Sequence, residues 1–237
     1  MIGIGIGIPL TRGGVSAPTL GTTMATTHYN RVIADGGVLP AGISGLGSVL
    51  DSVISAYGVT DSTDFNTKVP VFLDPQYTGY KLGAGSGTTL GQAARTVYAI
   101  SSSADVTQTT AASQPLLLDW SGVNYWWGSG VNGNYCSTPD AAANQITGDI
   151  EIKGTINGII SDSNYNNLVA KSNVGNNGYY AFVRLSQLNL SIGTGIAIST
   201  ATSSTLPFTD NQSFSFKITR VALTGAVSFY TSTDFIN

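Results

Sequence analysis

Two acidic residues, two positions apart, are the first place where this sequence could perform chemistry. Asp149 and Glu151 lie in the segment ITGDIEIKGTI, and in a strand such alternate positions face the same way. Paired carboxyl groups on one face are what glycoside hydrolases use for acid–base catalysis. The isoleucines of the segment occupy the other face, and Lys153 is next in the acidic row. We therefore expect a solvated strand face and no catalytic pair.

The other chemically versatile side chains are scarce. His28 is the single histidine and Cys136 the single cysteine. A Ser–His–Asp site would need His28, but no nucleophile motif lies near it, so we expect a capped or surface histidine. Cys136 has no partner for an internal disulfide and is expected to be a small buried residue. A zinc site would have to draw mainly on carboxylates. The glycine-rich loop at 83–91 lacks the lysine of a phosphate-binding loop.

We accordingly predict no enzymatic activity, no cofactor and no metal site. One alternative stays open for calcium, which prefers oxygen ligands. The segments DSNYNN (162–167) and TSTD (231–234) offer such oxygens. Oxygen-rich clusters of this kind are also found in ordinary loops.

The aromatic cluster Tyr125, Trp126 and Trp127 is the best candidate for a binding surface. Aromatic rings stack on sugars, and exposed ones mark interaction sites. Neighbouring residues of a strand face opposite ways, so Trp126 and Trp127 cannot both lie in one core. Core or subunit-interface packing and contact with a glycan both remain as interpretations.

The chain begins MIGIGIGIPL, with isoleucine at alternate positions and glycine between them. Period two is the strand period, so Ile2, Ile4, Ile6 and Ile8 share one face. The stretch is too short to span a bilayer, and no basic residue precedes it as in a signal peptide. A glycine-rich strand is weak alone and needs a partner sheet. It is either the first strand of the chain's own sheet or a docking arm that adds a strand to another subunit.

Composition favours a β-rich protein. Of the 237 residues 10% are charged, against about 25% in an average protein, and 42% are hydrophobic. Polarity comes instead from Gly, Ser, Thr and Asn, which suits strands and turns. The net charge is −3 and no run of Lys or Arg occurs. We therefore expect neither nucleic acid nor an anionic membrane surface as a partner.

Patterning divides the chain into four regions: an N-terminal docking arm at 1–20, a small α+β attachment region at 21–100, a polar linker at 101–115 and a β region at 116–237. Within the attachment region we expect helices at about 26–34 and at 43–57, and a strand at 69–74. Apolar residues recur every three or four positions in the second helix, and Gly58 is placed to end it. Glycines near its start weaken it but permit close packing.

From 116 onward the sequence consists of short alternating segments separated by Gly- and Asn-containing turns. Such spacing predicts an antiparallel sandwich or barrel. The expected strands cover 146–156, 167–170, 179–185, 188–192, 213–218 and 226–232, the third and fourth forming a hairpin. The fold class is thus mainly β, with a smaller α+β region before an antiparallel sandwich.

The runs GVNGNYCSTPDAAANQITGDIEIKGTI, YYAFVRL and SFKITRVALTGAVSFYTSTD in the second half resemble a concanavalin A-like, laminin-G-like jelly roll, in the form carried by virion proteins of tailed bacteriophages. The resemblance covers about 105–237. More loosely, GIGIGIP and RVIADGG resemble the N-terminal regions of structural proteins from crAss-like phages that infect Bacteroides.

This resemblance implies a structural virion protein, a head fibre or tail fibre, whose N-terminal half anchors it to capsid or tail. The implied partners are other virion subunits, including further copies of the chain in a trimer. A lectin-like module that recognises host surface glycan is the alternative. Family members continue past the strand that resembles SFYTS, whereas this sequence ends at Asn237. The jelly roll is thus expected to be partial, and either a longer chain or neighbouring subunits complete its sheets.

Overall fold

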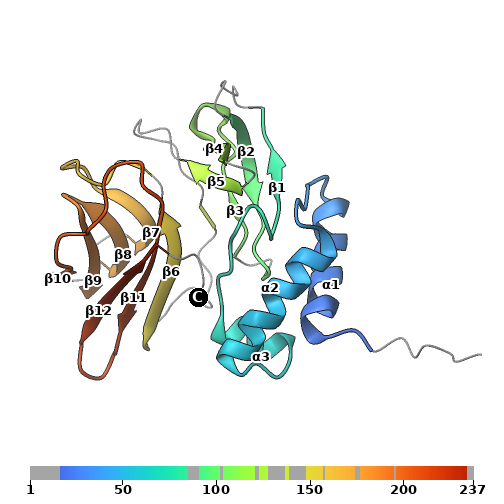
Figure 1. Cartoon of the computed structure of the whole chain (residues 1–237), viewed down its shortest axis with the longest axis horizontal. Helices are drawn as coiled ribbons and strands as arrows, with labels where there is room; N and C mark the ends of the chain where they lie inside the picture. Colours follow the sequence, from blue (N-terminus) through green and yellow to red (C-terminus); the bar gives the residue numbers. More distant parts are fainter. Residues whose placement is uncertain are drawn as a thin grey trace, which may run out of the picture. The chain divides into compact units, whose positions relative to one another are not determined.

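The computed structural model describes residues 17–84, 91–101, 104–120, 123–127, 137–138, 148–156, 158–173, 177–194 and 196–233. The docking arm's isoleucines and Cys136 lie outside these residues. The chain divides into two compact units, 1–140 and 141–237. The described part is mainly β, with three α-helices before the strands β1 to β12 and antiparallel pairing throughout (Figure 1), so the predicted fold class is confirmed. No described helix has the length and apolar character that crossing a membrane requires.

Three helices open the N-terminal unit: α1 (Leu20–Ala34), α2 (Gly42–Tyr57) and α3 (Ser62–Lys68). α2 confirms the helix expected at 43–57, and Gly58 ends it with a φ of 58°. α1 starts six residues earlier than expected, because the Thr19 side chain caps its first turn. α3 was not expected from the sequence, although Asp61 caps it by accepting from the backbone N–H groups of Thr63 and Asp64.

Glycines let α1 and α2 approach closely. A Cβ on Gly21 would lie 2.4 Å from the Asp51 carboxylate and 2.6 Å from the Gly47 carbonyl oxygen. Asp51, on α2, accepts hydrogen bonds from the Gly21 N–H at 3.0 Å and from the Thr19 hydroxyl at 2.8 Å. Its carboxylate therefore lies at the positive end of the α1 dipole. The close packing that the glycines of α2 permitted is thus found at Gly47.

The unit's sheet has the strand order β1-β2-β4-β5, with β3 paired to the end of β2. Its elements are β1 (Tyr80–Leu82), β2 (Gly91–Val97), β3 (Val106–Thr107), the 3-10 helix η2 (Ala111–Ser113), β4 (Leu116–Trp120) and β5 (Val123–Trp127).

Two expectations for this half differ from the structure. Residues 69–74 form no strand, since Pro70 offers no N–H to a ladder and only Leu73 makes a bridge, to Ala99. The predicted linker at 101–115 is part of the N-terminal unit. β3 pairs with β2 inside it, and β4, directly after it, does the same. The contact boundary instead follows Asp140.

The C-terminal unit is a sandwich of two antiparallel sheets. One has the order β10-β9-β8-β7 and the other β12-β11-β6, and they form separate layers in Figure 1. The strands are β6 (Ile150–Ile156), β7 (Asn166–Asn173), β8 (Asn177–Arg184), β9 (Gln187–Thr194), β10 (Ile198–Thr202), β11 (Phe214–Arg220) and β12 (Val227–Ser232). All the expected strands of this half are present, and β10 was not expected.

Alternate residues of the two sheets build one core between them. Phe214, Phe216 and Ile218 of β11 point inward as predicted and are fully or almost fully buried. They meet residues of β8 and β9 in a single cluster. Gly154 lies opposite Phe216, and a Cβ there would be 2.9 Å from the Phe216 ring. Glycine is therefore what allows that ring to lie across β6.

The predicted hairpin of β8 and β9 is confirmed, with an unusual turn. Leu185 and Ser186 have φ values of 50° and 57°, a conformation that Asn and Gly favour. The N–H groups of these two residues donate to the carbonyls of Asp162 at 2.8 Å and Ile160 at 2.7 Å. These bonds to a neighbouring segment hold the turn in the sandwich.

Candidate functional site

Asp149 and Glu151 are used for structural contacts. Asp149 accepts a hydrogen bond at 2.7 Å from the backbone N–H of Ala222, in the turn between β11 and β12. Glu151 is exposed and forms an ion pair at 3.0 Å with Lys153, two residues along the same face. Lys217 lies opposite Lys153 on β11. Asp149, Glu151 and Lys153 are all exposed, so the solvated face expected from the sequence is confirmed.

His28 is buried, with 3% of its surface exposed, so a surface position is wrong, whereas the alternative of a histidine with satisfied ring nitrogens agrees with the structure. Its Nε2 is 2.7 Å from the carbonyl oxygen of Thr78, and its Nδ1 is 3.2 Å from a guanidinium nitrogen of Arg31. A carbonyl can only accept and a guanidinium can only donate. Nε2 therefore carries the proton, Nδ1 accepts, and the ring is neutral.

Burial lowers the pKa of His28 below its ordinary value, and the positive charge of Arg31 lowers it further. The hydrogen bond to Thr78 and the negative charge of Asp105 oppose this shift. Because both ring nitrogens are engaged in fixed contacts, His28 has no free position from which to take a substrate proton.

The contacts around His28 join α1 to the sheet. Arg31 donates to both carboxylate oxygens of Asp105 and to the carbonyl of Ala99, while Asp105 also accepts from the Ala99 N–H at 2.7 Å. At the end of α1, Tyr98 donates to Asp35 at 2.6 Å, and this bond holds the pKa of Asp35 below its ordinary value. This cluster is an anchor between two elements.

The calcium alternative gains no support at 162–167, and Asp234 of the second segment, 231–234, lies outside the described residues. At 162–167 the Asp162 carboxylate accepts from the backbone N–H of Asn164 and from the side-chain amides of Asn164 and Asn166. Its oxygens thus form an Asx-type turn with neighbouring donors. Among the residues that the structure describes, no three His, Cys, Asp or Glu side chains gather as metal ligands.

The aromatic cluster lies on β5. Trp126 is opposite Leu117 and Trp127 is opposite Leu116 in the β4–β5 pair, with Tyr125 opposite Leu118. Only the backbone of β5 is described, so the role of its three aromatic side chains stays a prediction. The virion-docking residues Ile2, Ile4, Ile6 and Ile8 lie outside the described residues as well.

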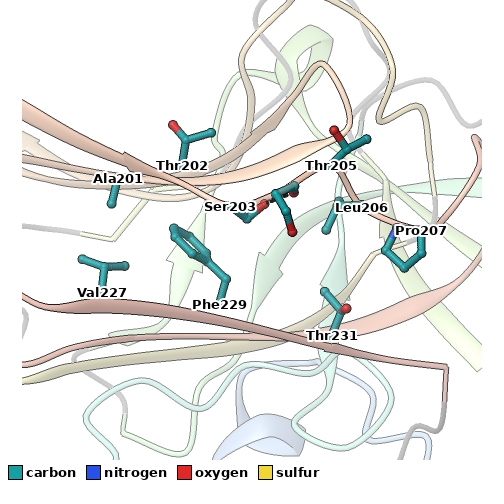
Figure 2. A pocket seen from close by; sticks show the side chains of 10 residues that line it. Ala201, Thr202, Ser203, Thr205, Leu206, Pro207, Val227, Phe229 and Thr231 are labelled. Atoms are coloured by element: carbon teal, nitrogen blue, oxygen red, sulfur yellow. Dashed lines mark hydrogen bonds between the residues drawn. The ribbon is translucent and has the colours of Figure 1, made fainter.

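The feature that the sequence did not predict is a groove at one side of the sandwich. It lies between β10, the last strand of one sheet, and β12, the last strand of the other, with a volume of about 340 Å³. Figure 2 shows Ala201 projecting from the β10 side, with Val227, Phe229 and Thr231 projecting toward it from β12. The lining residues are Ala201–Pro207, Val227, Phe229 and Thr231.

Polar atoms make up most of the accessible lining of the groove, and Val227 and Phe229 belong to its smaller apolar part. Val227 and Phe229 pack against the core cluster but are only half-buried, because no described strand covers them on the outer side. Thr231 and the Ser and Thr residues at 202–205 supply the hydroxyls. The lining contains no charged side chain. Such a surface suits an uncharged partner with hydrogen-bonding groups better than an ionic substrate.

No protein-family model, no curated protein and no solved structure matches this chain.

Proposed function

We propose that this chain is a structural subunit of a tailed-phage virion, in which the N-terminal half attaches to capsid or tail and the sandwich projects as part of a fibre or decoration. The proposal takes its source class from the sequence resemblance. The absence of catalytic activity is inferred from the described polar side chains, which already bind partners within the protein.

The observation that carries the proposal is the open side of the sandwich. Among the described strands, β10 and β12 are the last of their sheets, and the groove between them leaves the inner face of β12 half-exposed. A monomeric protein usually covers or blocks such edges, since they pair with other chains. An assembly subunit gains contacts by leaving them open.

The polar side chains support the same functional class. Three groups that could act as acid or base already have partners: His28 contacts Thr78, Asp149 contacts Ala222, and Glu151 pairs with Lys153. A catalytic base needs a free position aimed at a substrate. None of these three side chains has a free position of this kind.

Localisation in particles tests the proposal. Virions of the producing phage would be purified, and the chain located by antibody labelling and by mass spectrometry of the particles. We expect a fixed copy number per particle and labelling at one structural station. Absence of the chain from particles that are otherwise complete would refute the proposal.

Glycan binding is the second candidate, and exposed aromatic residues favour it. Tyr165 is 61% exposed and Tyr230 is 51% exposed. Each already has a cation over its ring, Arg184 at 4.7 Å and Lys217 at 4.6 Å from the centroid. A sugar would have to use the other ring face, so these tyrosines support the proposal less than free rings would.

The glycan proposal is tested with Trp126→Ala and Trp127→Ala, with Tyr165→Ala as the variant on the sandwich. Titration with capsular polysaccharide of the host would show saturable binding that weakens in at least one variant. Binding absent from the wild-type chain, across a broad glycan array, would exclude this function and leave the structural proposal untouched.

A further inference from the structure

The sandwich has two open edges on the same side, and together they restrict the kind of partner that fits. Among the described strands, β10 ends one sheet and β12 ends the other, with the groove between them. Figure 2 shows Ala201 of β10 and Phe229 of β12 projecting into the space between the two strands. Sheets packed face to face lie about 10 Å apart. A single extended segment can therefore pair with one of these edges but not with both.

A second copy of this chain presents two open edges at the same separation, because its sandwich is identical. We propose that two copies associate through these open sides, β12 pairing with β12 and β10 with β10, about one two-fold axis that crosses both sheets. A half-turn about such an axis reverses the direction of each strand and leaves each sheet in its own layer, so both pairs are antiparallel. This inference rests on the proposed function and deepens it, since it names the partner of the open side.

The two strands have the composition that pairing with an identical strand requires. β10 has the sequence ISTAT and β12 has VSFYTS, so neither contains a charged residue or a proline. An antiparallel pair of identical strands therefore brings no like charges together and lacks no N–H donor. The serine and threonine side chains can also form hydrogen bonds across such a pair. An uncharged partner with hydrogen-bonding groups is the kind that the lining of the groove favours.

The two faces of β12 limit the register of the pair. Phe229 lies on the inner face, opposite the buried Ile218 of β11, whereas Tyr230 lies on the outer face, opposite Lys217. In one continuous sheet, inner residues of one copy must lie beside inner residues of the other. The two registers with the longest overlap then place the axis at Phe229 or at Tyr230. Either register gives the half-buried Phe229 of each copy a neighbour from the other copy.

Lys217, on the neighbouring strand β11, does not oppose this association. Its ammonium group lies 4.6 Å from the centre of the Tyr230 ring. In a sheet that continues from β11 through both copies of β12 to the second β11, the two β11 strands are three strand spacings apart, about 14 Å. This distance exceeds the screening length of about 8 Å at physiological ionic strength, so the lysines of the two copies repel each other little.

Sedimentation of the full-length chain tests the association. Thr231→Lys places a charge on the inner face of β12, where the second copy pairs, and an inward-pointing charge blocks edge pairing. Thr155→Lys places the same side chain on β6 as the matched control, and both positions are exposed. We expect wild type and control to form an oligomer whose dissociation constant rises at least about ten-fold in Thr231→Lys only. A monomeric wild-type chain, or equal effects of the two substitutions, would overturn the proposal.

Cysteine pairing between copies provides the second test and locates the axis. In a Cys136→Ser background, one cysteine is placed in turn at each position of 227–232, with Thr155→Cys on β6 as the control. Only the residue on the axis lies directly opposite its own copy, at a distance that a disulfide can bridge. We expect the linked dimer to form fastest with cysteine at 229 or 230. Mixed copies, with cysteines two positions before and two positions after that residue, should link as readily.

The same scan over 198–202 tests the second edge, and it should give a maximum on β10 as well. Equal rates along either strand, linkage on β12 alone, or equal linkage through Thr155→Cys would refute pairing through both edges. These measurements use purified protein, so they are separate from the virion test. A chain that is present in particles but does not link through these strands overturns only this inference, whereas a linked dimer that is absent from particles overturns only the virion role.

Discussion

The substitution Gly21→Ala should weaken the N-terminal unit by about 2–4 kcal/mol, although alanine is the better helix former. Alanine gains about 1 kcal/mol over glycine in a helix. Its Cβ would lie 2.4 Å from the Asp51 carboxylate and 2.6 Å from the backbone carbonyl oxygen of Gly47. A carbon atom cannot lie this close to either oxygen, so Asp51 must move and the two helices must separate.

The magnitude follows from what is lost. Asp51 would give up its hydrogen bonds to the Gly21 N–H and the Thr19 hydroxyl, about 1 kcal/mol each because the site is partly exposed. Forcing an added methyl group against a backbone typically costs about 1–3 kcal/mol. The losses of about 3–5 kcal/mol exceed the helix gain of about 1 kcal/mol.

Urea unfolding, followed by the circular dichroism of the helices, measures this effect, since the described helices all lie in the N-terminal unit. Ser52→Ala, at an exposed position of α2, is the control and should change stability by less than about 0.5 kcal/mol. The double variant with Asp51→Ala should lose less than the two single losses combined, because one clash disappears. An unchanged or raised stability of Gly21→Ala would show that the helices do not meet at this crossing.

Three further outcomes are expected. The free energy of unfolding of the N-terminal unit should fall as pH drops below about 6.5, because the lowered pKa of His28 makes the unfolded state the better proton acceptor. This slope should level off below the folded pKa and vanish in His28→Gln, measured by urea titrations at a series of pH values. The hydrogen bond from the Ser161 hydroxyl holds the pKa of Asp210 below 3.8, so this carboxylate stabilises the C-terminal unit above that pH and ceases to do so as pH falls through the lowered value. Asp210→Ala should lower the thermal unfolding midpoint at neutral pH and remove this acid dependence. Gly154→Val should cost the sandwich about 1–3 kcal/mol in urea unfolding, because its Cβ would overlap the Phe216 ring.

The parts of the fold that depend on local pattern could be predicted from the sequence. The spacing of apolar residues gave α2, and Gly58 gave its end. The alternation of apolar and polar residues predicted which residues of β11 face inward, and it predicted the β8–β9 hairpin. In each of these, neighbouring residues along the chain supply the structure, so a short window contains the cause.

The errors share a different cause, which is a partner far along the chain. The start of α1 is supported by Asp51 of α2, about thirty residues away, as well as by Thr19. His28 is polar by type but is buried because Thr78 and Arg31 satisfy its two nitrogens. The polar stretch at 101–115 joins the N-terminal unit because β2 accepts β3 from it. A short stretch of sequence contains the residue but not the distant partner that determines its structure.

The groove shows why a binding surface can escape motif searches altogether. Its two sides are Ala201–Pro207 and alternate residues of β12, and nothing in either segment resembles a motif. The segments meet only because β10 and β12 are the last strands of two different sheets. What the sequence does carry is the absence of charge in both strands, in contrast to Glu151, Lys153 and Lys171 on the other edges.

That contrast is informative because charge is scarce in this chain. Only 10% of the residues are charged, so a charge on any one strand is uncommon. Charged residues occur on the edge strands β6 and β7 and on the inner strands β8 and β11, and none occurs on β10 or β12. If all four edges faced water in the working protein, all four would be equally exposed to unwanted pairing. The lack of charge on β10 and β12 makes them the two described edges best able to pair with another strand, whichever strand that is.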